Sequence, residues 1–139
     1  MKKTATKLLA VILSFVFILC LVSCNKTSEE AKSGIWENAA YTQNETVGEG
    51  SKEITVDIIA EDKTVTLTVK TDKATLGEAL FALGLINDAS FFDVLIGIKA
   101  DWNKDKAYWA FYKGDEMMNA GVNDAEISGG EYYRFVYTK

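Results

Sequence analysis

The segment from Ala107 to Lys113 places four aromatic side chains within seven positions and ends at a Gly-Asp pair. Aromatic enrichment bounded by turn residues is typical of a β-strand near the centre of a sheet. Because successive side chains of a strand point to opposite faces, Trp109 and Phe111 share one face and Tyr108 and Tyr112 share the other. One face is enough to build a core, so the second is free for another role.

The segments that precede this strand predict a hairpin and then a helix. Ile54–Ile59 and Val65–Val69 are β-branched, and polar residues join them at hairpin length. The apolar period then changes to a helical one. Thr75–Glu78 matches a capping box and Gly84 is a natural stop, which predicts one short amphipathic helix.

Two more strands are expected after the helix. Phe91-Phe92 and Val94–Ile98 form an apolar run, in which Gly97 indicates a bulge or a close approach. Glu131–Thr138 is again rich in aromatic residues. Between them, Trp102 lies in a polar connection. This order predicts an α+β fold, a β-grasp-like mixed sheet with one short helix packed on one face, if the first and last strands pair.

The N-terminus has the features of an export signal, assigned to residues 1–23. Three lysines precede the apolar run Leu8–Val22, which is shorter than the about 20 residues needed to span a bilayer. The run ends in Leu-Val-Ser-Cys, which resembles the lipobox of bacterial lipoproteins. That resemblance implies cleavage before Cys24 and attachment of a lipid to its thiol. An uncleaved anchor helix and an ordinary secretory signal are the alternatives.

Cleavage at Cys24 leaves residues 24–52 as an acylated N-terminus, tether and docking arm, followed by the folded domain at 53–139. Trp36 and Tyr41 are expected to dock on that domain, the alternative being a disordered arm. We therefore expect an extracytoplasmic domain held to the bacterial membrane by its lipid, with no other covalent cofactor. The cleaved chain has 12 basic and 20 acidic side chains, a charge of −8 without a basic stripe, so nucleic acid is not an expected partner.

Catalysis is not expected either. The sequence has no histidine, the cleaved chain has no free thiol, and no serine stands beside a plausible base. The loop acids Asp101, Asp105, Asp115 and Glu116 lack the spacing of a dedicated calcium site, so no metal site is predicted.

A ligand site is predicted on the sheet face that the helix leaves open. Arg134 does not belong in an apolar core, so its face should be the open one, and Tyr132 shares it by parity. With Tyr108 and Tyr112 this face offers rings for a flat ligand and polar groups for its rim. Trp102 is a further candidate. The alternatives are that the tyrosines only stabilise the sheet and that Trp102 folds back onto it.

From Trp36 onward the chain resembles the DUF4430 family, whose members are similar to the C-terminal β-domain of transcobalamin and intrinsic factor. The segments that carry the resemblance are Gly48–Gly50, Thr71–Leu80 with its Thr-Leu-Gly-Glu-Ala-Leu, Gly97–Asp101, Tyr108–Gly114, Gly121–Val122 and Tyr133–Tyr137. The chain departs from the family pattern at Ile96-Gly97, where an Asn-Gly turn is usual. The resemblance implies cobalamin or another corrinoid as ligand.

Two functions are consistent with these observations. The first is a cell-surface lipoprotein that binds a small molecule, such as a corrinoid, and captures it or hands it to a transporter. The second is an interaction module that contacts another surface protein or the cell wall through the aromatic face or a sheet edge.

Overall fold

The computed structural model describes residues 34–139, so the predicted signal peptide and the lipidation site Cys24 lie outside the described residues. Every residue of the hydrophobic core lies between Trp36 and Phe135, so the unit Lys32–Lys139 carries its own core. Within the described part, no helix has the length and apolar character needed to cross a bilayer.

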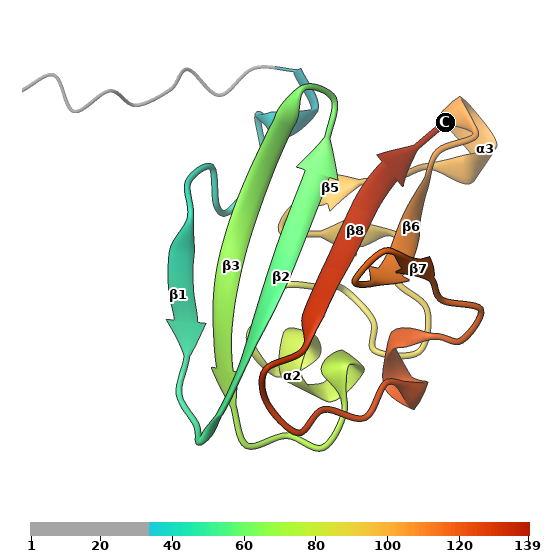
Figure 1. The fold of residues 1–139 in the computed structure, drawn as a ribbon. Coiled ribbons are helices and arrows are strands. Elements are labelled where there is room, and N and C mark those ends of the chain that lie inside the picture. Colours follow the sequence, from blue (N-terminus) through green and yellow to red (C-terminus); the bar gives the residue numbers. More distant parts are fainter. Residues whose placement is uncertain (1–33) are drawn as a thin grey trace, which may run out of the picture. The chain divides into compact units, whose positions relative to one another are not determined.

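A six-stranded mixed sheet forms the framework (Figure 1), in the order β1-β3-β2-β8-β6-β7. The strands are β1 (Glu45–Gly48), β2 (Lys52–Ala60), β3 (Lys63–Thr71), β6 (Tyr108–Lys113), β7 (Glu116–Met117) and β8 (Tyr132–Thr138). β2 and β3 form the predicted hairpin. β8 lies between β2 and β6, parallel to the first and antiparallel to the second.

The pairing of β2 with β8 confirms the predicted α+β, β-grasp-like class. Val56 lies opposite Tyr133 and Ile58 opposite Phe135 in this parallel pair. All four side chains are buried, on the face that the helix covers. The hairpin and the C-terminal strand therefore build the centre of the core together.

The helix α2 (Leu76–Ala82) forms as its sequence predicts. Thr75 Oγ1 accepts from the Glu78 amide at 3.3 Å, and the Glu78 carboxylate accepts from the Thr75 amide at 3.3 Å, which completes the capping box. After the C-cap Leu83, Gly84 takes a φ of 68°, the left-handed conformation that ends helices. A second, one-turn helix, α3 (Trp102–Asp105), occupies the expected polar connection.

The N-terminal arm docks on the domain, as expected. Trp36, in the 3₁₀ turn η2 (Gly34–Trp36), is buried and donates from Nε1 to the Ala60 carbonyl at 3.2 Å. The Ala40 amide donates to the Ile96 carbonyl at 2.7 Å. The arm therefore contacts the end of β2 and the turn at Ile96, and it packs into the core instead of covering the open-face tyrosines.

The run expected as one strand at Val94–Ile98 is instead a small hairpin, β4 (Val94–Leu95) with β5 (Ile98–Lys99). Ile96 and Gly97 have φ values of 48° and 87°, so the chain turns sharply between the strands. A β-branched residue rarely adopts this conformation. Full burial of Ile96 offsets that cost, and its amide donates to the Leu85 carbonyl at 2.6 Å. The predicted close approach at Gly97 is confirmed, since a Cβ there would lie 2.3 Å from the Asn38 carbonyl oxygen.

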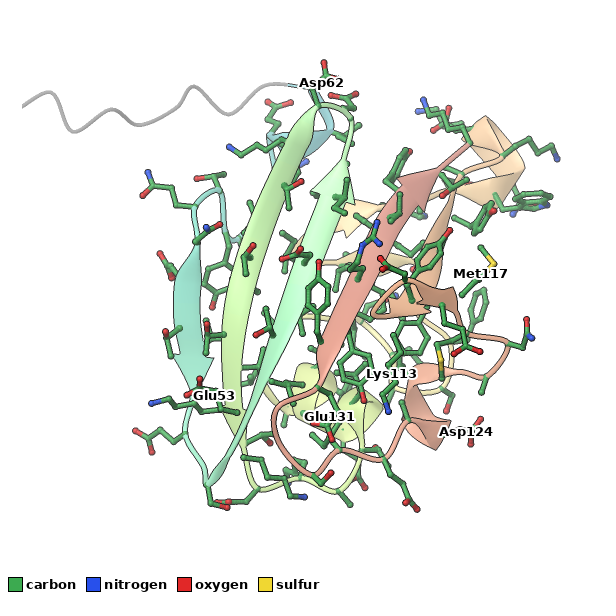
Figure 2. All side chains as sticks on the ribbon, viewed as in Figure 1. Glu53, Asp62, Lys113, Met117, Asp124 and Glu131 are labelled. Atoms are coloured by element: carbon green, nitrogen blue, oxygen red, sulfur yellow. The ribbon has the colours of Figure 1, made fainter. Side chains whose placement is uncertain are left out.

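A carboxylate fixes the turn that leads into β8 (Figure 2). Glu131 Oε1 accepts from the amide and hydroxyl of Ser128 at 2.7 and 2.8 Å, and Oε2 accepts from the Gly129 amide at 2.9 Å. Burial raises the pKa of Glu131, but these hydrogen bonds outweigh it and lower the pKa from 4.5 to about 2.

The lowered pKa of Glu131 predicts acid-sensitive stability. Because the folded-state pKa is below the unfolded one, the contribution to the free energy of unfolding is complete above about pH 4.5 and is lost as the pH falls toward about 2. Urea unfolding of the wild type and of Glu131→Gln should therefore give free energies that differ at pH 7 and converge toward pH 2. A difference that stays constant across this range would contradict the assignment.

Candidate ligand-binding groove

The two faces of the sheet divide as the sequence parity predicts. Phe111, Tyr133 and Phe135 are buried on the helix side, with Phe111 stacked on Phe135 at a centroid distance of 5.1 Å. Tyr108 and Tyr132 are exposed on the other side. The parity of the two aromatic strands therefore separates the buried rings from the exposed ones, while Trp109, Tyr112 and Tyr137 are half-buried.

On the open face, the Tyr132 side chain is held by a neighbouring carboxylate. Its hydroxyl donates to Asp57 Oδ2 at 2.5 Å, and Thr66 Oγ1 donates to Asp57 Oδ1 at 2.6 Å. The hydrogen bond to Asp57 is the main reason why the pKa of Tyr132 is raised. This hydroxyl already has a partner in the sheet.

Arg134 is also paired with a carboxylate on the open face. Its Nη1 lies 3.1 Å from Asp115 Oδ1, and its guanidinium lies 5.4 Å from the ring centroid of Tyr112. Tyr132 and Arg134 are therefore each paired with an acidic side chain, and Arg134 also lies over the Tyr112 ring. A ligand role for these three residues stays a prediction.

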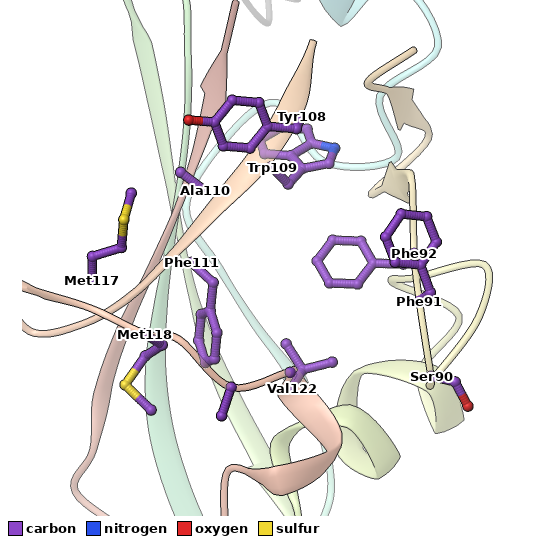
Figure 3. Close-up of a pocket in the computed structure, with 12 residues that line it drawn as sticks. Ser90, Phe91, Phe92, Tyr108, Trp109, Ala110, Phe111, Met117, Met118 and Val122 are labelled. Carbon is purple, nitrogen blue, oxygen red and sulfur yellow. The ribbon is translucent and has the colours of Figure 1, made fainter. Parts of the chain in front are cut away.

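A hollow lies along the outer edge of β6, between this strand and the Phe91–Phe92 segment (Figure 3). It has a volume of about 270 Å³ and is mostly apolar. The figure shows the Phe91–Phe92 segment on one side and Trp109 with Phe111 on the other. The lining is completed by Ser90, Tyr108, Ala110, Met117, Met118, Ala120, Gly121 and Val122.

A second hollow of about 350 Å³ adjoins the first. The two share the residues Phe91, Phe92, Tyr108 and Trp109. The second is bounded further by Asp93, Lys99, Ala100, Asp101, Trp102, Asn103 and Ala107, so α3 forms its outer wall. We refer to the two hollows together as the aromatic groove.

The loop that carries Phe91 is fixed by hydrogen bonds at its base and within it. Asn87 Oδ1 accepts from the amides of Asp93 and Val94 at 3.2 and 3.0 Å, and Asn87 Nδ2 donates to Asp93 Oδ1 at 2.7 Å. Asp88 Oδ1 accepts from the Phe91 amide at 3.1 Å. Phe91 is 82% exposed, yet its backbone is held in place. The entropic cost of ordering this loop when a ligand binds is therefore small.

Phe92 and Trp109 join the groove to the core. Phe92 contacts Phe135 edge-on at 5.6 Å, and Trp109 contacts Tyr137 edge-on at 5.5 Å. Trp109 Nε1 is buried and has no hydrogen-bond partner among the described residues. The inner wall of the groove is therefore continuous with the packed interior.

The structure brings together two of the predicted site residues at the groove. Trp102 and Tyr108 meet edge-on, with ring centroids 6.3 Å apart. Neither hollow is lined by Tyr112, Tyr132 or Arg134.

Sequence reasoning missed Phe91 and Phe92 as site residues because they were read with the apolar run that follows them. One signal was available, since adjacent residues of an extended chain point to opposite sides and one of two neighbouring phenylalanines is then left out of the core.

The acidic residues at the groove have structural partners. Asp101 Oδ1 accepts from the amides of Asn103 and Lys104 at 3.0 Å and caps α3. The bond from the Lys104 amide is the main cause that lowers the pKa of Asp101, with Lys99 adding to the effect. Residues 34–139 contain no cluster of three or more acidic, histidine or cysteine side chains that could hold a metal ion.

No protein-family model and no curated protein matches the chain. Among solved structures, the fold is similar to a suspected metal-binding protein from Ruminococcus gnavus ATCC 29149, with 25% identity, a TM-score of 0.59 and coverage of 64% of this chain and 98% of that one. Haptocorrin in complex with Cbi matches with 17% identity and a TM-score of 0.45, over 67% of this chain and 26% of that one. Membership of DUF4430 stays a prediction.

Proposed function

We propose that the protein is a non-catalytic, membrane-anchored surface lipoprotein that binds a flat, largely apolar small molecule in the aromatic groove. The groove offers rings on both walls, from the Phe91–Phe92 segment and from β6. Aromatic walls with a few polar groups at the rim are typical of small-molecule sites. The lipid on Cys24 keeps the domain at the outer surface of the cell membrane, where it captures its ligand.

The observation that carries the proposal is the exposure of Phe91. A phenylalanine ring that is 82% exposed gains little from folding, yet the hydrogen bonds of Asn87 and Asp88 hold its backbone beside the groove. Exposed apolar groups that line a concavity are more often functional than scattered single ones.

A corrinoid is the first ligand to test. Its ring system is flat and its rim carries polar side groups, which suits apolar walls with Asn103, Lys99 and Tyr108 at the outer hollow. The sequence resemblance to the transcobalamin group favours the same class. Capture and hand-over to a transporter is the corresponding role.

A peptide partner is the second candidate, favoured by the free edge of β6. β7 pairs only with Tyr112 and Lys113, so the outer edge of Tyr108–Ala110 has no strand partner in the described part of the chain. Extended peptides add to such edges through their backbones. A surface protein with an exposed extended segment would then be the partner.

Tryptophan fluorescence distinguishes the two candidates. Cobinamide and cobalamin, titrated into the unit Lys32–Lys139, should quench its emission saturably, because Trp102 and Trp109 line the groove. Free tryptophan at the same absorbance corrects for light absorbed by the ligand. A dissociation constant of about 1 mM corresponds to a binding free energy of only about −4 kcal/mol. Absence of saturable quenching up to about millimolar ligand would therefore exclude corrinoids and leave the peptide candidate.

The same titration separates the groove from the open face. Tyr132→Phe and Arg134→Gln alter the open face only and should leave the dissociation constant unchanged. A clear loss of affinity in both variants would move the site to the open face, as the sequence alone predicted.

A further inference from the structure

One end of the sheet gathers the start of the described chain, the C-terminus and α3 (Figure 1). Gly34 lies next to Glu61 in the turn that follows β2. β8 runs parallel to β2 and therefore ends at the same end of the sheet, and Tyr108 lies opposite Thr138 at the start of β6. α3 immediately precedes β6. A tether that joins the domain at Gly34 thus reaches it at the end where α3 lies.

This end also exposes aromatic rings beside lysines. Trp102 is 57% exposed and touches the exposed Tyr108. Lys106 Nζ lies 5.3 Å from the Trp102 ring, and Lys139 Nζ lies 5.9 Å from the Tyr137 ring. We call Trp102, Lys104, Lys106, Tyr108 and Lys139 the α3 corner.

The composition of the α3 corner matches the interface of a bilayer. Tryptophan and tyrosine are enriched at the headgroup level, and lysine stems cover apolar surface while their ammonium groups stay in water. Asp101 and Asp105 offset two of the three lysines of the corner, so the corner is close to neutral. Glu61 and Asp62 lie at the same end of the sheet, in the turn between β2 and β3. The chain after Cys24 carries a charge of −8, so most of the acidic excess lies elsewhere. An anionic membrane therefore repels the rest of the domain more than this corner.

We infer that the α3 corner rests on the headgroup region of the phospholipid bilayer, with Trp102 at the interface. The inference rests on the proposed lipid anchor, because the anchor joins the domain at the end of the sheet where the corner lies. The ten residues from Cys24 to Ser33 span at most about 35 Å, enough for the corner to reach the surface. The outer hollow of the groove, walled by α3, then opens next to the membrane.

The contact can be tested whether or not Cys24 is acylated in the cell. The unit Lys32–Lys139 contains no cysteine and holds its own core, so one cysteine added before Lys32 couples it uniquely to a maleimide-headgroup lipid. The vesicles contain phosphatidylcholine and phosphatidylglycerol, with or without bromine near the glycerol end of the acyl chains. Bromine should quench the tryptophan emission of the wild type. In Trp102→Phe the quenching should be at least about threefold smaller, because Trp36 is buried and Trp109 is half-buried, whereas Trp102 is exposed.

Phe81→Ala is the matched control, since Phe81 is 52% exposed on α2, toward the other end of the sheet. Its quenching should equal that of the wild type. Equal quenching in the wild type and Trp102→Phe, or no quenching in either, overturns the bilayer contact. The mass of the Cys24 peptide from the full chain tests the anchor separately, so failure of the anchor and failure of the contact are distinguishable.

Discussion

Replacing Phe135 with alanine is expected to lower the free energy of unfolding by about 3–5 kcal/mol, the usual cost of deleting a fully buried aromatic ring. Phe135 has no exposed surface and lies in β8, the strand that joins the hairpin to β6. Its ring contacts Phe92 at 5.6 Å and Phe111 at 5.1 Å. The substitution therefore removes the contact between the groove wall and the centre of the sheet. Urea unfolding followed by circular dichroism measures the change.

Tyr132→Phe is the control for this experiment, because it alters the same strand on its exposed face. It removes the hydrogen bond to Asp57 at the surface, which is worth about 1 kcal/mol or less. Comparable losses in the two variants would show that the sheet faces are assigned wrongly.

Phe91→Ala is expected to weaken ligand binding about tenfold, which corresponds to about 1.4 kcal/mol. The ring lines both hollows, so its loss removes apolar contact along the whole groove. Stability should change by no more than about 0.5 kcal/mol, because the ring is mostly exposed and contributes little to the core. Corrinoid titrations and urea unfolding of the same protein preparation provide both numbers.

Phe81→Ala again serves as the matched variant, since it removes an exposed phenylalanine that lies on α2 and lines neither hollow. It should leave the affinity at the wild-type value. If Phe91→Ala binds as tightly as Phe81→Ala, the groove is not the site. If it unfolds the protein, the Phe91 ring has a role in the core that its exposure does not indicate.

The parts of the fold that the sequence predicted are those set by local pattern. The alternation of apolar residues with threonine predicted the position of β3. The capping box at Thr75 and the stop at Gly84 predicted the position of α2. The aromatic parity of β6 and β8 assigned both faces before any pairing was known. In each case the determining interactions lie within a few residues of one another.

The parts that were missed depend on contacts distant in sequence. β1 is short and polar on most positions, and it forms because β3 offers a free edge for parallel pairing. The turn at Ile96 contradicts local preference and is stabilised by Leu85 and the N-terminal arm. The groove arises between the Phe91 loop and β6, whose approach no periodicity encodes.

The parallel pairing of β2 with β8 has a consequence for how the chain folds. Tyr132 and its partner Asp57 are 75 positions apart, and β8 is the only link between the β3–β2 hairpin and β6 within the main sheet. Pairing over such a separation closes a long loop and is slow compared with hairpin formation. A chain that emerges N-terminus first cannot complete its sheet until its final seven-residue strand is available. The native core of the described domain can therefore form only after the residues of β8 have emerged.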